Sequence, residues 1–344
     1  MPESEGRCIC GRFVAATEAA ALAAARWVGK GDGLAADHAA REAMAAVFAE
    51  MPVRARVVAG RSGDREQNIL RVGAGLGKEF GPWFTSSMNV EDGLDDRADA
   101  WDLAVDALQA PNALARGMDG ALAMIAAGPP GSLMPVPEMY MQKLVVPTQA
   151  AAAIDLDAPV EENIKAVAAA LGRREEDLVV VVLDRPRHEQ LIAQIKRCGA
   201  RVGLIVDGDV SAGLAAASGD SGVDMYIGIG GSTEGILTAA ALRSLGGEMQ
   251  ARFWPVSRHQ VELVTIAGIA DIEARLTSRD MAGEGVLVVA TAVTGARFLR
   301  AVDAQPDGIR TESMVLCSRC CAIRKIQTIH RSTNGGQRVN LGAR

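Results

Sequence analysis

The sequence of 344 residues has no long apolar run and no excess of basic residues. A membrane-spanning helix needs about 20 consecutive apolar residues, and no segment approaches that length. The formal net charge of -6 argues against a nucleic acid or an anionic membrane as a partner, because proteins that bind these surfaces are basic. The first residues, MPESEGRCICGR, lack the apolar core of a signal peptide. We therefore expect a cytoplasmic protein with no nucleic-acid or membrane partner.

Cysteine is the next scarce residue, and its placement leaves two interpretations. The segment CSRCC contains a C-x-x-C pair, which spans two ligand positions of a zinc site, but the second pair would have to come from the distant Cys8 and Cys10. The segment ESMVLCSRCCAIRKIQTIH resembles a strand, which would point Cys320 and Cys321 to opposite faces. We interpret the cysteines as reduced structural thiols and leave the role of Cys317, Cys320 and Cys321 open.

What the sequence has in quantity is the material of a soluble globular protein. Hydrophobic residues make up 49% and charged residues 23%, and the length allows one large or two ordinary domains. Apolar spacing predicts helices over residues 13–31 and 34–51, and strands within 53–60, 101–108 and 120–128. The punctuated stretch GPPGSLMPVP follows at 128–137. We predict an α+β domain over residues 1–147 and an α/β domain over residues 148–344.

The second half repeats a strand followed by a helix four times, beginning near residues 178, 202, 223 and 286. Such alternation predicts a parallel sheet, whose ligands bind at the carboxyl ends of the strands. Those ends are RPRH, DGD, GIGGSTEG and TAVTG.

Each strand end has a functional and a plainer interpretation. The glycine-rich loop could cradle a phosphate or form a tight turn. Arg187 and His188 could bind a phosphate, or the arginine could be a solvated side chain at a helix start. Asp207 and Asp209 could accept hydrogen bonds from sugar hydroxyls or cap a helix.

The segment WDLAVDALQAP raises a separate question. Its apolar residues predict a buried strand that delivers Asp106 to a loop edge, with residues 107–111 breaking the strand. The loop offers Gln109 and Pro111 but no second acid and no hydroxyl, so the partners of Asp106 must come from elsewhere in the chain.

Six blocks, in order, resemble the class II fructose-1,6-bisphosphatases of the GlpX type. They are GKGDGLAAD, PEMYMQKLVVP, RPRH, VDGDV, YIGIGGSTEG and IRKIQTIH, and the similarity runs from about residue 13 to residue 331. The resemblance implies an α/β layered sandwich of the sugar-phosphatase superfamily, which includes inositol monophosphatase and fructose-bisphosphatase. It also implies Mg²⁺- or Mn²⁺-dependent removal of the 1-phosphate from a small sugar phosphate.

The resemblance also implies roles for individual residues. The metal carboxylates map onto Asp37, Asp106 and Glu234, and we assign catalysis to Asp106 and Glu234. The substrate contacts map onto Tyr140, Arg185, Arg187, His188, Asp207, Gly208, Asp209 and Gly231.

The chain departs from the family pattern at the metal motifs. G-E-G-E-I-D-E is GRSGDRE here, which replaces a metal glutamate with Arg61, and D-P-I-E-G-T is DALQAP, which gives Gln109 and Pro111 in place of a glutamate and a threonine. The lysine of G-D-K is Gly33, and the TAVTG loop has Ala292 where the family has glycine. Hard dications need several charged oxygens, so we expect one ion instead of two. Asp64 or Glu66 is an alternative ligand if the loop register slips.

Three functions remain open at this stage. The first is a divergent sugar-phosphate phosphatase, with activity in doubt because of Arg61, Gln109 and Pro111. The second is a sugar-phosphate or nucleotide-sugar enzyme of another reaction type, such as an elimination, in which Arg61 binds phosphate. The third is a catalytically silent homologue that binds sugar phosphate. We also expect a homo-oligomer.

Overall fold

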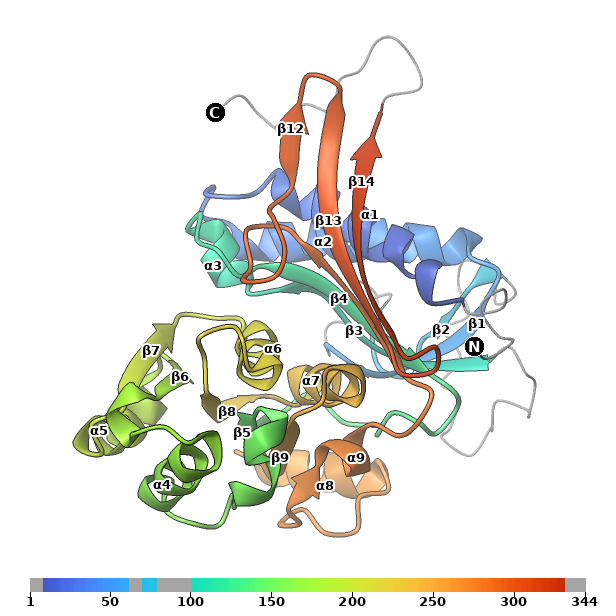
Figure 1. Ribbon diagram of the computed structural model, residues 1–344. Coiled ribbons are helices and arrows are strands. Elements are labelled where there is room, and N and C mark those ends of the chain that lie inside the picture. The colour runs from blue at the N-terminus through green and yellow to red at the C-terminus, as the bar shows by residue number, and fades with distance from the viewer. Residues whose placement is uncertain (1–8, 62–69, 79–99, 332–344) are drawn as a thin grey trace.

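The computed structural model describes residues 9–61, 70–78 and 100–331, which form two sheets separated and covered by helices (Figure 1). The first sheet has the strand order β12-β13-β11-β4-β3-β1-β2, with β14 paired to β13. Its strands are β1 (Arg54–Gly60), β2 (Gly75–Leu76), β3 (Ala100–Gln109), β4 (Leu122–Gly128), β11 (Leu287–Ala292), β12 (Asp303–Gln305), β13 (Gly308–Cys317) and β14 (Ala322–His330). The second has the order β10-β9-β5-β8-β6-β7, formed by β5 (Tyr140–Val146), β6 (Val179–Leu183), β7 (Arg201–Ile205), β8 (Met225–Gly231), β9 (Glu248–Trp254) and β10 (Leu276–Thr277).

Helices complete five layers around these sheets. α1 (Val14–Ala25) and α2 (Gly33–Glu50) cover the outer face of the first sheet, α6 (Asp209–Ser218) and α7 (Ser232–Leu245) lie between the sheets, and α4 (Val160–Leu171) and α5 (Glu189–Arg197) cover the outer face of the second. Every residue of β3 and of β4 is buried because helices cover both faces of these strands. The observed layers are those of an α/β sandwich, as predicted.

The remaining short elements connect these layers. They are η1 (Ile9–Gly11), α3 (Pro111–Ala115), η3 (Thr148–Ala153), η4 (Glu175–Asp177), η5 (Pro186–His188), α8 (Arg258–Ile266) and α9 (Ser278–Met281).

The predicted helices and strands of the first 128 residues are confirmed, with one change of detail. Alanine-rich α1 packs closely on the first sheet, and Phe13 stacks against both Phe48 and Trp101 with ring centroids 6.2 and 6.1 Å apart. The strand around Asp106 does not break at Ala107 but continues to Gln109, with an irregular register to β4 between these positions.

The predicted parallel sheet is only partly correct. β6 pairs in parallel with β7 and β8, but β5, β9 and β10 add antiparallel strands. The fourth strand–helix unit is wrong. β11 joins the first sheet antiparallel to β4 and β13, and residues 293–331 contain no helix.

The two sheets do not follow the predicted division at residue 147. β5 precedes that position yet belongs to the second sheet, and β11–β14 return to the first. The chain crosses between sheets through residues 129–139, and pairing of β11 with β4 brings it back. Sheet membership depends on hydrogen bonds between strands far apart in the chain, which local patterns do not contain.

The strand predicted near the C-terminus is a hairpin. β13 ends at Cys317, residues 318–321 turn, and β14 begins at Ala322, so Cys320 and Cys321 do not alternate along one strand as predicted. Among the described residues, no helix combines the length and apolar character needed to cross a membrane.

Candidate active site

The ends of strands from both sheets meet at one place in the molecule. The backbone N–H and side-chain amide of Asn112, which follows β3, donate to Asp207 Oδ2 after β7, at 3.4 and 3.1 Å. A side chain added at Gly208 would lie 3.4 Å from Ala110 Cβ and 4.0 Å from Gln109 Oε1. The predicted metal positions and sugar-binding loop are therefore neighbours.

Asp106 lies at the centre of this meeting point, and its partners are unusual. Its side chain is 2% exposed, and neither carboxylate oxygen accepts a hydrogen bond from the described residues. Burial raises the pKa of Asp106 well above its ordinary value; Arg61 opposes this shift, and the nearby Glu234, Asp37 and Asp207 add to it. A buried carboxyl group without donors needs either a proton or a cation.

Asp37, in the first turns of α2, brings a second carboxylate to Asp106. Its Oδ2 receives Arg41 at 2.9 Å and Arg61 at 3.4 Å, whereas its buried Oδ1 has no hydrogen-bond partner. Arg61 follows the end of β1, and its pKa is raised by Asp106, Asp37 and Glu234 against the opposing effect of burial. The guanidinium of Arg61 therefore places a positive charge inside the predicted metal cluster.

Two arginines, not one, offset the carboxylates of this cluster. Asp37, Asp106 and Glu234 contribute -3 and Arg41 and Arg61 contribute +2, which leaves a net charge of -1. The alternative ligands Asp64 and Glu66 lie outside the described residues.

Glu234 completes the acidic cluster from the first turn of α7. A side chain at Gly231 would lie 2.0 Å from Glu234 Oε2, so this position must be glycine for the carboxylate to fold back over the end of β8. Burial, followed by the charge of Asp209, raises the pKa of Glu234. The segment GIGG is the end of a strand and not a loop, because β8 continues to Gly231 and the helix begins at Ser232.

A buried ion pair lies beside Glu234. Lys143, on β5 and 1% exposed, donates to Asp209 Oδ2 at 2.6 Å and to the carbonyl of Gly231 at 2.8 Å. The Tyr226 hydroxyl donates to the same aspartate oxygen at 3.4 Å, and burial raises the pKa of Tyr226 well above its ordinary value. Oδ2 of Asp209 is thus bonded within the protein, and the predicted contact of Asp209 with a sugar hydroxyl stays a prediction.

Asp207 and Gly208 retain the geometry expected of a ligand loop. Asp207 is half-buried, accepts the Gly208 N–H at 3.1 Å as well as the Asn112 bonds, and lines a cleft between the 118–120 turn and α6. Gly208 adopts φ 89° at the start of α6. Neither aspartate caps this helix through its side chain.

Arg187 and Tyr140 form an exposed pair at the end of the second sheet. Arg187 is exposed, stacks 4.8 Å from the centroid of the Tyr140 ring, and donates from Nε and Nη2 to the Ile229 carbonyl at 3.3 and 2.8 Å. Tyr140 pairs with Gly231 across β5 and β8, and Arg185 donates to the Asp184 carbonyl. The guanidinium of Arg187 is therefore oriented by protein contacts while remaining accessible.

Both ring nitrogens of His188 contact backbone groups in this structure, which differs from the predicted phosphate contact. The side chain is 1% exposed, Nδ1 lies 2.8 Å from the Leu183 carbonyl, and Nε2 accepts the Ile229 N–H at 2.8 Å. These contacts assign the proton to Nδ1 and leave neither nitrogen for a phosphate. Burial lowers the pKa of His188. Its place is a structural link between β6 and β8.

The departures from the family motif are in contact with one another. A side chain at Gly33 would approach the Pro111 carbonyl oxygen to 2.7 Å, so the glycine that replaces the motif lysine lies directly against the proline that replaces the motif threonine. Ala110 adopts φ 60° where the family pattern has glycine. Both side-chain atoms of buried Gln109 lack hydrogen-bond partners among the described residues.

The cluster has oxygen atoms that suit a divalent cation. Asp37 Oδ1 and both oxygens of Asp106 are buried acceptors without donors among the described residues, and oxygen is the ligand atom that Mg²⁺ and Mn²⁺ prefer. Arg61, placed among the carboxylates, supplies the charge that a second ion would otherwise bring.

Sequence reasoning missed four residues of this site: Arg41, Asn112, Lys143 and Tyr226. Arg41 had a signal, since it follows Asp37 by four residues on a helix. Lys143 lies within the quoted block PEMYMQK, where a lysine in an apolar strand indicates a buried partner.

The structure is a five-layer α/β sandwich whose acidic cluster lies beside the loop of Asp207 and Gly208. The comparisons give the family. The bacterial, glpX-encoded fructose-1,6-bisphosphatase family matches residues 7–330, and the chain belongs to it.

Several characterised relatives cover almost the whole chain. A D-fructose 1,6-bisphosphatase class 2/sedoheptulose 1,7-bisphosphatase of Synechococcus sp. (strain JA-2-3B'a(2-13)) is 38% identical over 92% of this chain and 94% of its own length. A protein of the same description from Trichodesmium erythraeum is 34% identical over the same shares. The fructose-1,6-bisphosphatase class 2 of Haemophilus influenzae is 33% identical over 94% of this chain and 96% of its own. Membership implies dependence on a divalent metal, and nothing in these relatives favours an elimination or a purely binding role.

Proposed function

We propose that this chain hydrolyses one phosphate ester of a sugar bisphosphate, with fructose 1,6-bisphosphate and sedoheptulose 1,7-bisphosphate as the first candidates. The observation that carries the proposal is the set of unpartnered carboxylate oxygens on Asp37 and Asp106, directly beside the loop of Asp207 and Gly208. The names of the relatives supply the two candidate sugars.

A single Mg²⁺ or Mn²⁺ on Asp37, Asp106 and Glu234 would offset negative charge on the reacting phosphate. Arg61 adds a fixed positive charge next to the same position, which suits an anionic group. Arg187, stacked on Tyr140, binds the phosphate that does not react, and Asp207 accepts hydrogen bonds from the sugar. These contacts hold the ester in one orientation relative to the carboxylates.

We assign proton transfer to Glu234, whose carboxylate folds back over the end of β8 beside the predicted metal position. Pro111 has no hydroxyl to orient the attacking water. The Gln109 amide, which has no protein partner, can orient a water molecule but cannot accept its proton. We therefore propose slower hydrolysis than in a family member with the complete D-P-I-E-G-T motif.

The test is a phosphate-release assay with both bisphosphates, in Mg²⁺, in Mn²⁺ and in chelator. We expect release only with metal, and a loss of at least about 100-fold in Asp106→Asn, because the neutral amide is a much weaker ligand for a hard dication. Asp220→Asn, an exposed change, serves as the matched control. Metal-independent release, or full activity of Asp106→Asn, would exclude this site as the centre of hydrolysis.

The cytoplasmic location and the homo-oligomer stay predictions, as does the division into two domains. Size measurement in solution by light scattering decides the oligomeric state.

A further inference from the structure

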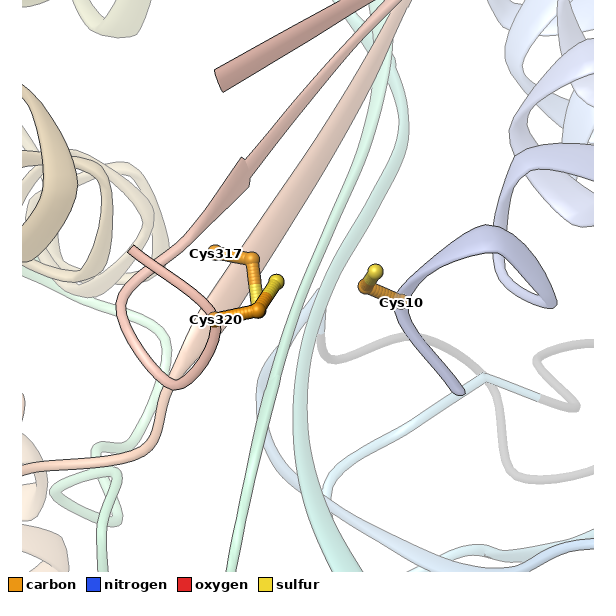
Figure 2. Close-up of side chains that lie close together, drawn as sticks. All are labelled: Cys10, Cys317 and Cys320. Atoms are coloured by element: carbon orange, nitrogen blue, oxygen red, sulfur yellow. The ribbon is translucent and has the colours of Figure 1, made fainter. Parts of the chain in front are cut away.

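Three cysteines from opposite ends of the chain converge at the turn of the β13–β14 hairpin. Cys10 comes from η1, Cys317 ends β13, and Cys320 lies in the turn (Figure 2). Their sulfur atoms all lie within 4.8 Å of one another. Cys10 and Cys317 are 7% and 0% exposed, and Cys320 is half-buried, so the sulfurs meet at the edge of the core.

This cluster is separate from the acidic site. Cys317 pairs with Leu287, Leu287 with Ala127, and Ala127 with Leu103, so the cluster lies three strands away from β3. Along β3 the corresponding row is three residues before Asp106. None of the chemistry assigned above uses these cysteines.

We propose that Cys10, Cys317 and Cys320 bind a thiophilic dication, with zinc as the expected ion. In tetrahedral zinc sites the Zn–S distance of about 2.3 Å places neighbouring sulfurs about 3.8 Å apart. Sulfurs within 4.8 Å of each other therefore need to close by no more than about 1 Å to coordinate one ion. The C-x-x-C spacing in a hairpin turn, with one further cysteine from a distant segment, is the arrangement of ligands in small structural zinc sites.

The charge next to the sulfurs supports the assignment. Arg324 Nη1 lies 3.4 Å from Cys320 Sγ and 3.8 Å from Cys10 Sγ. A guanidinium next to a thiol favours the thiolate form, which is the form that binds a metal ion. The neighbouring Cys321 adopts φ 47° and donates from its thiol to the Ser318 carbonyl at 3.5 Å, so its sulfur has a contact apart from the cluster.

A metal accounts for the geometry better than a disulfide does. A disulfide joins two sulfurs at about 2.05 Å and leaves a third out, whereas here three sulfurs from two separate segments converge. The structure has no disulfide among the three. Bound metal would also tie η1 to the hairpin across more than 300 residues of chain, and metal binding of this kind adds to folding stability.

The test uses the full-length protein, reduced and stripped of metal, and titrates it with Cd²⁺. Cadmium–thiolate bonds give an ultraviolet charge-transfer band that carboxylate ligands do not give, so binding at Asp37 or Asp106 does not contribute. We expect the band to saturate at about one Cd²⁺ per chain, and excess Mg²⁺ not to compete.

Single Cys10→Ser and Cys320→Ser changes should remove at least about 90% of the band at one equivalent, because each removes a soft ligand. Cys321→Ser, in the same turn, and Cys198→Ser, in a remote part of the fold, should leave it unchanged. Circular dichroism and phosphate release confirm that each variant is folded. As a second readout, zinc should raise the melting temperature of the wild type and of Cys321→Ser but not of Cys320→Ser.

Two outcomes would overturn the proposal. One is a reduced wild-type protein without a cadmium–thiolate band. The other is a band that survives in folded Cys10→Ser and Cys320→Ser, or falls equally in the Cys198→Ser control.

Discussion

The ends of the two sheets meet at the candidate site, and their buried polar side chains differ in whether they have hydrogen-bond partners. At the end of the second sheet, Lys143, Asp209 and His188 are buried and bonded to protein partners. At the end of the first sheet, Asp106 and Gln109 are equally buried but have side-chain atoms without hydrogen-bond partners among the described residues.

The difference separates positioning from binding. Burying a polar group without a hydrogen bond costs roughly 1–3 kcal/mol, so a folded protein keeps such groups where something outside the chain completes them. The satisfied residues hold the loops in place, and the unsatisfied oxygens indicate where an ion or a substrate binds. The family motif marks both kinds of residue alike and does not tell them apart.

The largest effect is expected when one partner of the buried ion pair at the end of the second sheet is removed. Lys143→Met removes one partner of the buried pair and leaves Asp209 without its counter-charge. We expect the free energy of unfolding to fall by about 3–5 kcal/mol, measured by urea denaturation. Lys165→Met, on the exposed face of α4, should change it by less than about 0.5 kcal/mol. A loss below about 1 kcal/mol for Lys143→Met would mean that the pair is not closed in solution.

The converse experiment restores acids at the unsatisfied edge. Arg61→Glu with Gln109→Glu moves the cluster from -1 to -4, since the first change alters the charge by two and the second by one. We expect Mn²⁺ to bind at least about 100-fold more tightly by calorimetry, about 2.7 kcal/mol, because affinity rises with ligand charge and number. Bisphosphatase activity should rise only when Pro111→Thr is added as well. Position 33 is kept as glycine in this variant, because a side chain there would meet the backbone of residue 111.

The control for this variant is Arg26→Glu, an exposed change at the end of α1 that alters the charge by two, as Arg61→Glu does. An equal gain in Mn²⁺ affinity in the control would mean that the effect comes from the net charge of the protein and not from new metal ligands. A double variant that folds and binds no better would show that Asp106 is not a metal ligand.

Arg187 is an accessible residue at the end of the second sheet, so its substitution tests substrate binding there. Arg187→Ala should weaken fructose 1,6-bisphosphate binding by about 1.5–3 kcal/mol, the range for a charge-assisted hydrogen bond. Its exposed position predicts little change in stability. Arg258→Ala, equally exposed on α8, is the control. Unchanged affinity would leave Arg187 with only its Tyr140 and Ile229 contacts.

Substitution of His188 should have the smallest effect on the free energy of unfolding. The direction in which stability changes with pH distinguishes a structural histidine from a phosphate-binding one. His188→Gln should cost about 1–2 kcal/mol at pH 8, because it disturbs two buried backbone contacts. In the wild type the folded-state pKa lies below the unfolded value of about 6.5, so the unfolded chain takes up the proton first. The contribution of His188 to the free energy of unfolding should therefore be complete above pH 6.5 and should decline as the pH falls toward the folded-state pKa.

Unfolding curves between pH 8 and pH 5 measure this decline, which the His188→Gln variant should lack and the exposed His259→Gln control should retain. Asp106 and Glu234, whose raised pKa values act with the opposite sign, are present in the wild type and in the variant, so the comparison isolates His188. Equal curves for the wild type and His188→Gln would show that His188 does not cause the decline.

The sequence alone determined the local structure and the family. Apolar periodicity located α1, α2, β1, β3 and β4, because burial of one face leaves its spacing in the chain. Six ordered blocks identified the bisphosphatase resemblance and with it the layered fold. They also exposed the altered metal motifs, since Arg61, Gln109 and Pro111 differ in residue type from the pattern.

Tertiary structure decided what those residues touch. Only the return of β11–β14 to the first sheet, by pairing with strands more than 150 residues away, sets the true division of the chain into sheets. Only the tertiary structure shows that Arg41 adds a second positive charge at Asp37 and that both ring nitrogens of His188 contact backbone groups. It also brings Cys10 next to Cys317 and Cys320. The physical reason is common to all: residue type fixes which contacts a side chain can make, whereas long-range chain pairing selects which of them it makes.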